Sequence, residues 1–164
     1  MSENYPIRAC WMKVGQQKQL PACGGVQRFY HLFGAYNWRT DTLCYTHAAK
    51  KNSETFIQFL EHLLVETYPQ QTLVLVMDNV SYHRSLAVQA ALSAFEHRVV
   101  VFYLPTYSPD LNLIERFWRH LKDRVCANRF FDNTPLLLDA IAQTVQLQND
   151  PSYLFRLTFS KDLQ

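Results

Sequence analysis

The sequence lacks the features of a membrane, secreted or zinc-binding protein. Its longest uninterrupted apolar runs cover residues 73–77 and 99–104, far short of the roughly 20 residues that span a bilayer. The first residues, MSENYPIRACWMK, contain no apolar core of the signal-peptide type. The four cysteines form no CxxC pair and have no ligand-like spacing with histidine. We therefore expect a cytoplasmic protein with no membrane partner, reduced and mostly buried thiols, and no zinc site.

A strong charge of one sign is also missing, because the net charge is only +2 and the pI is near 8.4. This balance permits a nucleic-acid partner without demanding one. The basic residues are nevertheless concentrated after Glu115. That stretch is either a solvated helix face or a surface that contacts phosphates. Its basic members are Arg116, Arg119, Lys122, Arg124 and Arg129.

No repeat, low-complexity segment or linker divides the chain, so we expect a single domain over residues 1–164. With 48% hydrophobic residues the chain has enough apolar surface for a core. Aromatic and β-branched runs at 26–38 and 42–48 predict a hairpin. The two long apolar runs are typical of strands that are covered on both faces. Helical patterns cover about 53–67, 85–95, 113–126 and 135–147.

This order of elements predicts an α/β fold, a mixed sheet with helices packed on its faces. The first helix has Ser53 as a candidate N-cap and stops at Pro69.

Two acidic residues have positions that suit chemistry, although each also has an ordinary structural explanation. Asp78 follows the apolar run 73–77, at the carboxyl end of a strand, where open α/β sheets bind ligands. It could equally begin a turn. Glu115 fits a capping box with Asn112 and an ion pair with Arg119, four residues on.

Taken together, the two carboxylates are more informative. If the two apolar strands share a sheet, the helix that carries Glu115 begins near the edge where Asp78 lies. Two carboxylates there suit Mg²⁺ or Mn²⁺. Two such ions about 4 Å apart activate a water and stabilise the leaving oxygen of a phosphodiester. His83, Tyr107 and Ser108 could approach a phosphate there, or serve as solvent-facing, turn and capping residues.

The residues around these carboxylates resemble a known family. LVLVMDNVSYHRS followed by VVVFYLPTYSPDLNLIERFWRHLK is similar to the insertion-sequence 630 branch of the mariner-type DDE transposases. That branch has an apolar strand ending in Asp-Asn with a nearby His, and then LPxYSPxLNPIExxWxxLK. FGAYNW, TFIQFLEHLL and CWMKVGQQKQLP also resemble its earlier segments. The resemblance covers about residues 8 to 125.

The resemblance implies a ribonuclease-H-like fold and a transposase that cuts insertion-element ends and joins them to target DNA with two divalent ions. Asp78 and Glu115 match the second and third acidic residues of its triad, with 36 residues between them. The partners it implies are transposon-end and target DNA, and a second copy of the protein in a homodimer. The candidate DNA-contacting residues are His83, Arg84, Tyr107, Arg116, Arg119 and Lys122.

Two departures from the family pattern matter. Leu113 stands where the family has Pro before Ile-Glu. This difference should make the start of the helix only slightly less favourable. The family's first Asp ends a strand just upstream of the segment that contains Trp11. Here Glu3 is the only acidic residue before Asp41, and Asp41 falls in the hairpin turn. The first catalytic strand and the N-terminal DNA-binding domain are therefore expected to be missing from this chain.

This expectation leaves a second hypothesis beside a weak or inactive transposase domain. The chain could be a non-catalytic remnant that binds DNA or partner chains, because a sheet without its first strand has an exposed edge that invites pairing. A two-metal nuclease of the same fold is a third possibility. It explains the YSPDLN motif less well.

Overall fold

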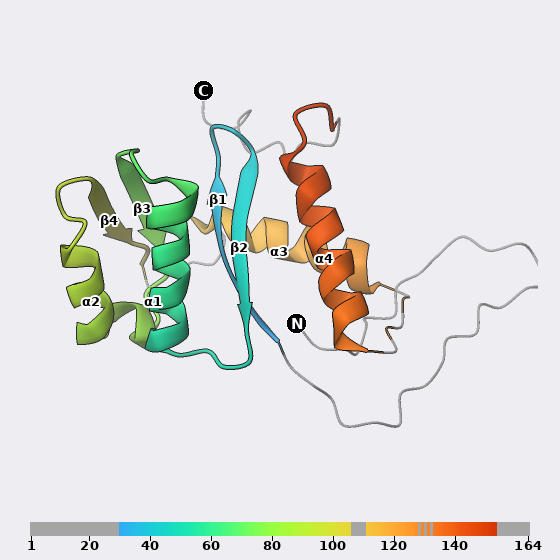
Figure 1. Ribbon diagram of the computed structural model, residues 1–164, viewed down its shortest axis with the longest axis horizontal. Helices are drawn as coiled ribbons and strands as arrows, with labels where there is room; N and C mark the ends of the chain where they lie inside the picture. The colour runs from blue at the N-terminus through green and yellow to red at the C-terminus, as the bar shows by residue number, and fades with distance from the viewer. Residues whose placement is uncertain (1–29, 106–110, 128, 130, 132, 154–164) are drawn as a thin grey trace, which may run out of the picture.

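The protein has an α/β fold in which a hairpin stands between two groups of helices (Figure 1). The computed structural model describes residues 30–105, 111–127, 129, 131 and 133–153. The strands are β1 His31–Asn37, β2 Thr42–Ala48, β3 Leu73–Met77 and β4 Val99–Tyr103. The helices are α1 Ser53–Glu61, the π-helix η1 His62–Thr67, the 3₁₀ helix η2 Ser81–Arg84, α2 Leu86–Ser93, α3 Leu113–Cys126 and α4 Thr134–Asn149.

The predicted hairpin is confirmed. Strands β1 and β2 pair antiparallel, from His31 opposite Ala48 to Asn37 opposite Thr42. The turn contains Asp41 at a φ of 57°. Aspartate is one of the few residues that adopt this left-handed conformation readily. The hydroxyl of Tyr36 donates a hydrogen bond to the Asp41 carboxylate and ties the turn to β1.

Within the described residues, the outer edge of β2 is bordered by a side chain rather than by another strand. The backbone N–H of Leu43 donates to Oδ1 of Asn149 at 2.7 Å, and Nδ2 of Asn149 donates to the carbonyl of Leu43 at 2.8 Å. The amide thus mimics a neighbouring peptide group. Because Leu43 is only 3% exposed, these two groups would otherwise be buried without partners.

Strands β3 and β4 pair in parallel, with Leu73 opposite Val99 and Met77 opposite Tyr103. The ladder continues at both ends, where Leu73 N–H donates to Arg98 and Leu104 N–H donates to Met77, each at 2.8 Å. The two apolar strands thus share a sheet, which is the condition that the sequence argument set.

Two expectations about the sheet are corrected. Among the described residues the four strands form two separate two-stranded sheets rather than one mixed sheet. The apolar strands are also not covered on both faces. The α1 side of β3 is packed, whereas Val74 and Val76 are 63% and 55% exposed. The reason is that no described strand continues the sheet beside β3, and no described helix packs on its second face. The exposed face continues on β4 with Val100 and Phe102.

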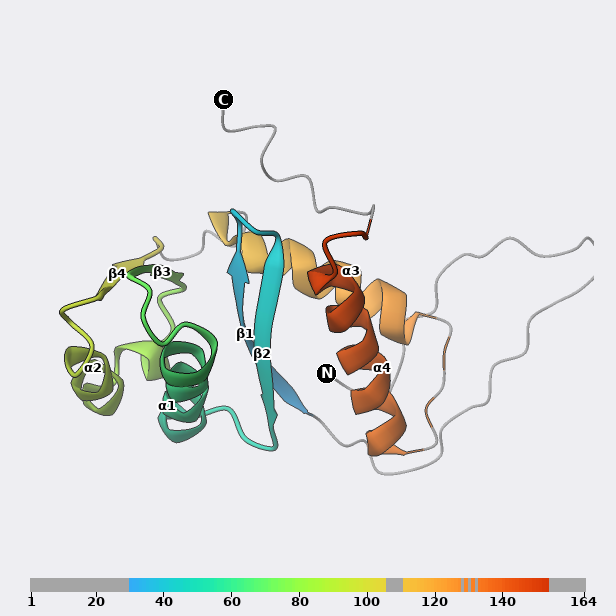
Figure 2. The ribbon, with the colours of Figure 1, turned by 45° about the horizontal axis from the view of Figure 1, so that its top comes forward.

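The hairpin separates two apolar cores, as two views of the ribbon show (Figures 1 and 2). On one face Phe33 packs with α1, α2, β3 and β4. On the other face Leu43 packs with α3 and α4, whose contact residues include Phe117 and Ile141. This division follows from the alternation of side chains along a strand. Gly34 makes room for α3, because a Cβ there would lie 2.8 Å from two ring atoms of Trp118.

The helix predictions hold with small corrections. Helix α3 has the predicted bounds, and α2 and α4 differ from theirs by one or two residues. The N-cap of α1 is Asn52 rather than Ser53, because Asn52 and Thr55 exchange the two hydrogen bonds of a capping box. The last predicted turns of this helix form η1. The guanidinium of Arg98 donates to the carbonyl of Leu64 in η1 and to the carbonyls of Tyr68 and Gln71, which follow it.

The described cysteines, Cys44 and Cys126, are buried free thiols, as expected, and burial raises the pKa of each. Cys10 and Cys23 lie outside the described residues. In the described part of the chain no helix is both long and apolar enough to cross a membrane.

The Asn149 contact gives the first prediction. We expect Asn149→Ala to lower the free energy of unfolding by about 2–4 kcal/mol, because it leaves two buried backbone groups of Leu43 unpaired. Urea denaturation followed by circular dichroism measures the loss. Gln146→Ala, an exposed position in the same turn of α4, is the matched control and should change stability by less than about 0.5 kcal/mol. Equal stability of the two variants would contradict the edge-closing role.

Candidate functional site

Asp78 and Glu115 line one pocket of about 450 Å³. Its walls are β1 and β3, and α1 and the start of α3 contribute apolar side chains. Asp78 directly follows β3, and Glu115 lies in the first turn of α3. The two carboxylates that the sequence argument places at one edge of the sheet thus line the same pocket, and their role there stays a prediction.

Asp78 is held by the imidazole of His83. Nδ1 of His83 lies 2.6 Å from Oδ1 of Asp78 and 3.2 Å from the backbone carbonyl oxygen of the same residue. A single proton on Nδ1 can therefore be shared between these two oxygens of Asp78. The Oδ1 atom of Asp78 is buried against His83, where the short distance marks an ion-pair contact rather than a well-aligned hydrogen bond. The Asp78 side chain as a whole remains 42% exposed, so the carboxylate is still accessible on its other side.

The electrostatic surroundings keep Asp78 ionised. The hydrogen bond from His83 is the main reason that the pKa of Asp78 lies below its ordinary value. Partial burial opposes this effect, and the charge of Lys51 adds to it. The pKa of the Tyr82 hydroxyl is raised, first by burial and then by the negative charge of Asp78.

His83 is a buried residue, at 8% exposure. Its ring lies 4.0 Å from the ring of Phe56 and 4.3 Å from that of Tyr82, centroid to centroid. The hydroxyl of Tyr103 donates to the His83 carbonyl at 3.3 Å. The sequence left His83 between a phosphate contact and a solvent-facing or capping residue. The structure shows instead a packed ring that fixes Asp78.

The two ordinary explanations for Glu115 are not supported. Asn112 is the N-cap of α3, but its side chain makes no capping hydrogen bond, so the reciprocal capping box is absent. In the ranges that the structure describes, Glu115 makes no ion pair with Arg119 and no side-chain hydrogen bond. Its backbone N–H donates to the Asn112 carbonyl at 3.0 Å. The exposed carboxylate is therefore available for another role.

The basic residues of α3 face solvent, as both explanations of that stretch require. Arg116, Arg119 and Lys122 are exposed, while the opposite face of α3 packs on α4. Glu115, Arg119 and Lys122 are spaced by four and three residues and so share one stripe of the helix. The structure fixes their exposure and leaves their contacts with DNA as a prediction.

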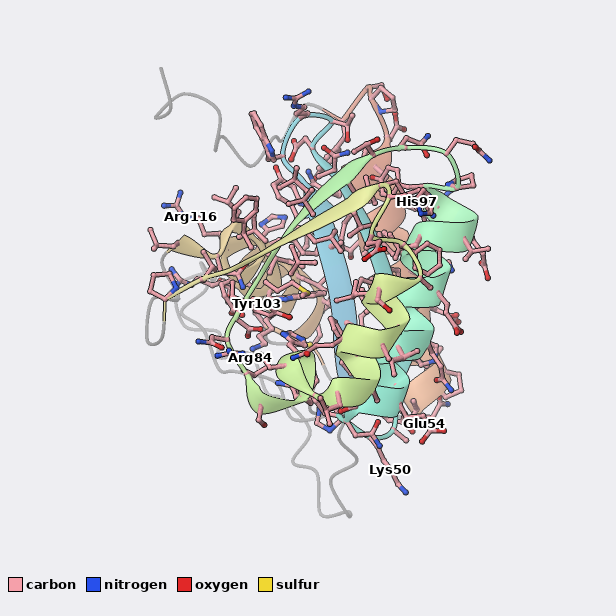
Figure 3. The ribbon with its side chains drawn as sticks, turned by 90° about the vertical axis from the view of Figure 1, so that its left-hand side faces the viewer. Lys50, Glu54, Arg84, His97, Tyr103 and Arg116 are labelled. Carbon is pink, nitrogen blue, oxygen red and sulfur yellow. The ribbon has the colours of Figure 1, made fainter. Side chains whose placement is uncertain are left out.

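Arg84 contacts Asn79, the residue that follows Asp78. It donates to Oδ1 of Asn79 at 3.1 Å and lies over the ring of Tyr103 at 5.6 Å. Arg84 and Tyr103 neighbour each other in Figure 3, which also labels Arg116 on α3. Tyr107 and Ser108 lie outside the described residues.

The donor set fits a hard divalent cation only in part. Two carboxylates at one pocket are suitable oxygen ligands for Mg²⁺ or Mn²⁺. In the described ranges, however, no three His, Cys, Asp or Glu side chains gather into a group that could hold a metal ion. Asp78 and Glu115 can therefore contribute to a metal site, and a further ligand has to come from elsewhere.

Comparison with known proteins decides the family. The family model described as DDE superfamily endonuclease matches residues 1–137. The chain belongs to the DDE superfamily endonucleases. An insertion element IS630 protein of 39 kDa from Shigella sonnei is 33% identical over 125 residues, which cover 76% of this chain and 36% of that protein. The chain thus spans about a third of the length of this curated relative. Within the superfamily its sequence is similar to this IS630 protein.

Solved structures show the same fold. The Mos1 strand transfer complex superposes with a TM-score of 0.62 and 17% identity, covering 87% of this chain and 43% of the Mos1 chain. The Mos1 transposase paired-end complex with the left transposon end has a TM-score of 0.59 and 17% identity, covering 88% and 49%. At this identity the likeness concerns the fold, which is the mixed α/β fold of the Mos1 transposase.

Sequence reasoning missed three residues that line this candidate site. Lys51 lines the pocket, and its positive charge helps to lower the pKa of Asp78. Its Nζ atom lies 5.3 Å from the Tyr82 ring centroid. Tyr82 and Trp118 also line the pocket. Lys51 stands 27 residues before Asp78 in the loop that leads to α1, a position that carries no recognisable motif. The packing of α1 against η2 brings it close.

The contact with His83 gives a prediction for the pKa of Asp78. His83→Phe keeps an aromatic ring against Phe56 and Tyr82 but removes Nδ1. We expect the pKa of the Asp78 carboxyl to rise towards its ordinary value of 3.8, because the main cause of its lowering is gone. Titration of the ¹³C shift of that carboxyl measures the change. Tyr82→Phe, which removes only a hydroxyl, should leave the Asp78 pKa low.

The same variant has a signed effect on stability. A carboxyl whose folded-state pKa is lowered stabilises the fold above its ordinary pKa of 3.8, and this contribution is lost as the pH falls below it. The difference in free energy of unfolding between wild type and His83→Phe should therefore shrink as the pH drops below about 4. A difference that is constant down to the acid limit would contradict the role of His83.

Proposed function

We propose that the chain is the catalytic part of a transposase with a ribonuclease-H-like fold. In this role it cleaves DNA at insertion-element ends and transfers the cut strand by two-metal phosphoryl transfer. The observation that supports this most directly is the shared pocket of Asp78 and Glu115, at the carboxyl end of β3 and the start of α3. The family membership gives the reaction class.

Each residue of the proposed site has a defined role. Asp78 and Glu115 are the metal ligands, and divalent ions bound there would activate the attacking oxygen and stabilise the leaving one. His83 keeps Asp78 ionised and fixes the rotamer in which it meets a cation. Lys51 adds positive charge beside the same carboxylate. No covalent enzyme intermediate is required.

The exposed stripe of α3 is the proposed path of the DNA backbone. Arg119 and Lys122 continue along the helix from Glu115, and Arg116 follows Glu115 directly, so phosphates on both sides of a scissile bond can be neutralised. Arg84 extends the positive surface on the other side of Asp78. The Mos1 structures contain a strand transfer complex and a paired-end complex. By analogy we propose a homodimer on paired element ends for this protein.

A non-catalytic role is the second candidate. One observation favours it, which is that the described residues bring two carboxylates rather than three to the site. A protein of this kind would bind DNA or a second copy of itself without cutting. Metal-dependent cleavage separates the two candidates.

The first test measures nicking of element-end DNA with Mg²⁺ or Mn²⁺. It uses the chain itself and, in parallel, the chain extended upstream by an apolar strand that ends in Asp. We expect weak or no nicking by the chain alone and clear nicking by the extended protein. Asp78→Asn or Glu115→Gln should slow nicking by roughly 100-fold or more, about 2.7 kcal/mol of transition-state stabilisation, because each removes a metal ligand.

Glu96→Gln is the matched control for this assay. Glu96 is exposed and lies outside the pocket, so its substitution should leave the rate unchanged. Nicking that persists after both Asp78→Asn and Glu115→Gln would overturn the assignment. Absence of nicking by the extended protein at every metal concentration would favour the non-catalytic candidate.

The second test concerns DNA affinity and its dependence on salt. Arg119→Ala and Lys122→Ala should each weaken binding to duplex DNA, and each should reduce the slope of log affinity against log salt by about 0.9. Fluorescence anisotropy at several salt concentrations measures both quantities. Lys50→Ala, an exposed lysine at the other end of the molecule near the start of α1, is the control (Figure 3). Unchanged slopes for both α3 variants would mean that this face of α3 is exposed to solvent and does not contact DNA phosphates.

A further inference from the structure

Helix α2 exposes apolar surface that a solvated helix does not normally carry. Its sequence, LAVQAALS, contains no charged residue. Nevertheless Leu86 is 84% exposed, and Ala87 and Ala90 are exposed as well. Helix α3 shows the usual arrangement, because every one of its exposed residues is charged. A helix that is apolar on all sides is normally covered on all sides, so the outer surface of α2 has the composition of an interface.

A groove of about 470 Å³ runs between α2 and the continuous helix formed by α1 and η1. The two helices lie side by side on the face that Figure 3 turns to the viewer. Ile57 and Val65 line the groove from one helix, and Ala91, Ala94 and Phe95 line it from the other. Apart from two glutamates, every residue that lines the groove is apolar. This lining suits a ligand that brings apolar groups of its own.

The edge of the groove at η1 is held in a fixed conformation. Helix η1 is a π-helix, a rare form that is found frequently at functional sites. The N–H of Tyr68 donates to the carbonyl of Leu63 at 2.9 Å, and the guanidinium of Arg98 donates to the carbonyl of Leu64. The same guanidinium lies 5.1 Å from the ring centroid of Phe95. The groove is therefore preformed, and a ligand binds without first ordering it.

The edges of the groove are acidic. Glu61 and Glu66 line it, and Glu96 is exposed just beyond the end of α2. Glu66 pairs with His62 at 2.8 Å. In the ranges that the structure describes, Glu61 and Glu96 make no ion pair and no side-chain hydrogen bond. The nearby guanidinium of Arg98 is occupied by backbone carbonyl groups. The charges therefore favour a basic ligand and disfavour DNA.

The backbone of the two walls determines the shape of the ligand. Within a helix the N–H and C=O groups pair along the axis, so these walls offer no edge to an extended strand. A polypeptide that leaves water for this groove must satisfy its own backbone groups, which an α-helix does. The lining of α1 and η1 extends from Ile57 to Glu66. At 1.5 Å per residue this is about 13 Å, or roughly two and a half helical turns.

We propose that the groove binds an amphipathic α-helix of another protein. One face of that helix carries apolar residues at spacings of three and four, which pack between Val65 and Ala94. Lysine or arginine residues beside this face pair with Glu61 and Glu96. The small side chains of Ala91 and Ala94 allow the bound helix to approach α2 closely.

The groove is distinct from the candidate catalytic site. Phe56 and Phe59 of α1 line the pocket of Asp78, whereas Ile57 and Glu61 line the groove, so the two use neighbouring faces of the same helix. Binding in the groove goes beyond the proposed function and requires neither a metal ion nor DNA. The two proposals can therefore fail independently.

The test uses the full chain, labelled with ¹⁵N and with ¹³C in its methyl groups, and designed peptides. The first peptide has about 18 residues, or five helical turns. It carries leucines at spacings of three and four, lysines on both sides of that face and alanine elsewhere. The second has the same composition in an order that scatters the leucines around the helix. The third has glutamate in place of each lysine. Shifts of amide and methyl signals locate and quantify binding.

We expect the lysine peptide to shift the signals of Ile57, Val65 and Ala94, and to bind roughly tenfold or more tightly than either of the other two. Ala94→Trp fills the groove and should weaken this binding by roughly tenfold or more. Ala142→Trp is the matched control, because Ala142 is an exposed alanine of α4. It should bind the lysine peptide as the wild type does.

A second pair of variants tests the charge. Glu61→Lys should weaken binding of the lysine peptide and strengthen binding of the glutamate peptide, since the sign of the edge is reversed. Asp139→Lys changes the net charge of the protein equally, at an exposed position of α4. It should leave both affinities unchanged. Equal effects of the two variants would mean that only the overall charge matters, which overturns the proposed site.

Three further outcomes would overturn the proposal. Nuclear Overhauser contacts in the free chain from the Val65 or Ala94 methyl groups to residues 1–29 or 154–164 would mean that the chain fills its own groove. A concentration-dependent dimer in sedimentation velocity that Ala94→Trp abolishes would assign the groove to a second copy. Equal binding of the lysine peptide and its scattered counterpart would show charge attraction without recognition of a helix face.

Discussion

The arrangement of this protein depends on the pairing of strand edges. A backbone group that is removed from water needs a partner, and β2 obtains one through the side-chain amide of Asn149. The other edge of the hairpin and the free edge of β3 have no strand beside them in the described ranges, and they border the same pocket. This asymmetry separates the four strands into two small sheets, and it places α1 and the start of α3 along the pocket between them.

The acidic site is built on the same edges. Asp78 is the residue at which β3 ends, so its position is set by the ladder with β4, and its side chain is set by His83. His83 is in turn locked between Phe56 of α1 and Tyr82 of η2. Glu115 has no comparable support from the described residues, although α3 is anchored through Phe117 and through Trp118 against Gly34. One ligand of the proposed pair is thus rigidly preorganised, and the other is an exposed side chain on a rigid helix.

The sequence predicted most of the elements well, because these depend on local patterns. The bounds of α3, the hairpin and the two apolar strands follow from periodicity and apolar runs. The errors concern effects that local patterns do not contain. The N-cap is Asn52 rather than Ser53, because Asn52 and Thr55 form the two hydrogen bonds of a capping box. The role of His83 depended on Phe56, which is 27 residues away, and Lys51 came to Asp78 only through the packing of α1. The family motif indicated the candidate site, whereas the contacts that lower the pKa of Asp78 are visible only in the folded structure.

The exposed face of β3 and β4 is the remaining disagreement between sequence and structure. Continuous apolar runs are typical of interior strands, yet Val74, Val76 and Phe102 are each more than half exposed. Both strands therefore have the composition of interior strands in a sheet that extends no further in the described residues. The odd-numbered residues of β3 belong to the core that also contains residues of α1 and α2, so one face of the strand is packed. The even-numbered residues point to the other face, and covering them would need an element that packs on that face rather than a strand at the edge.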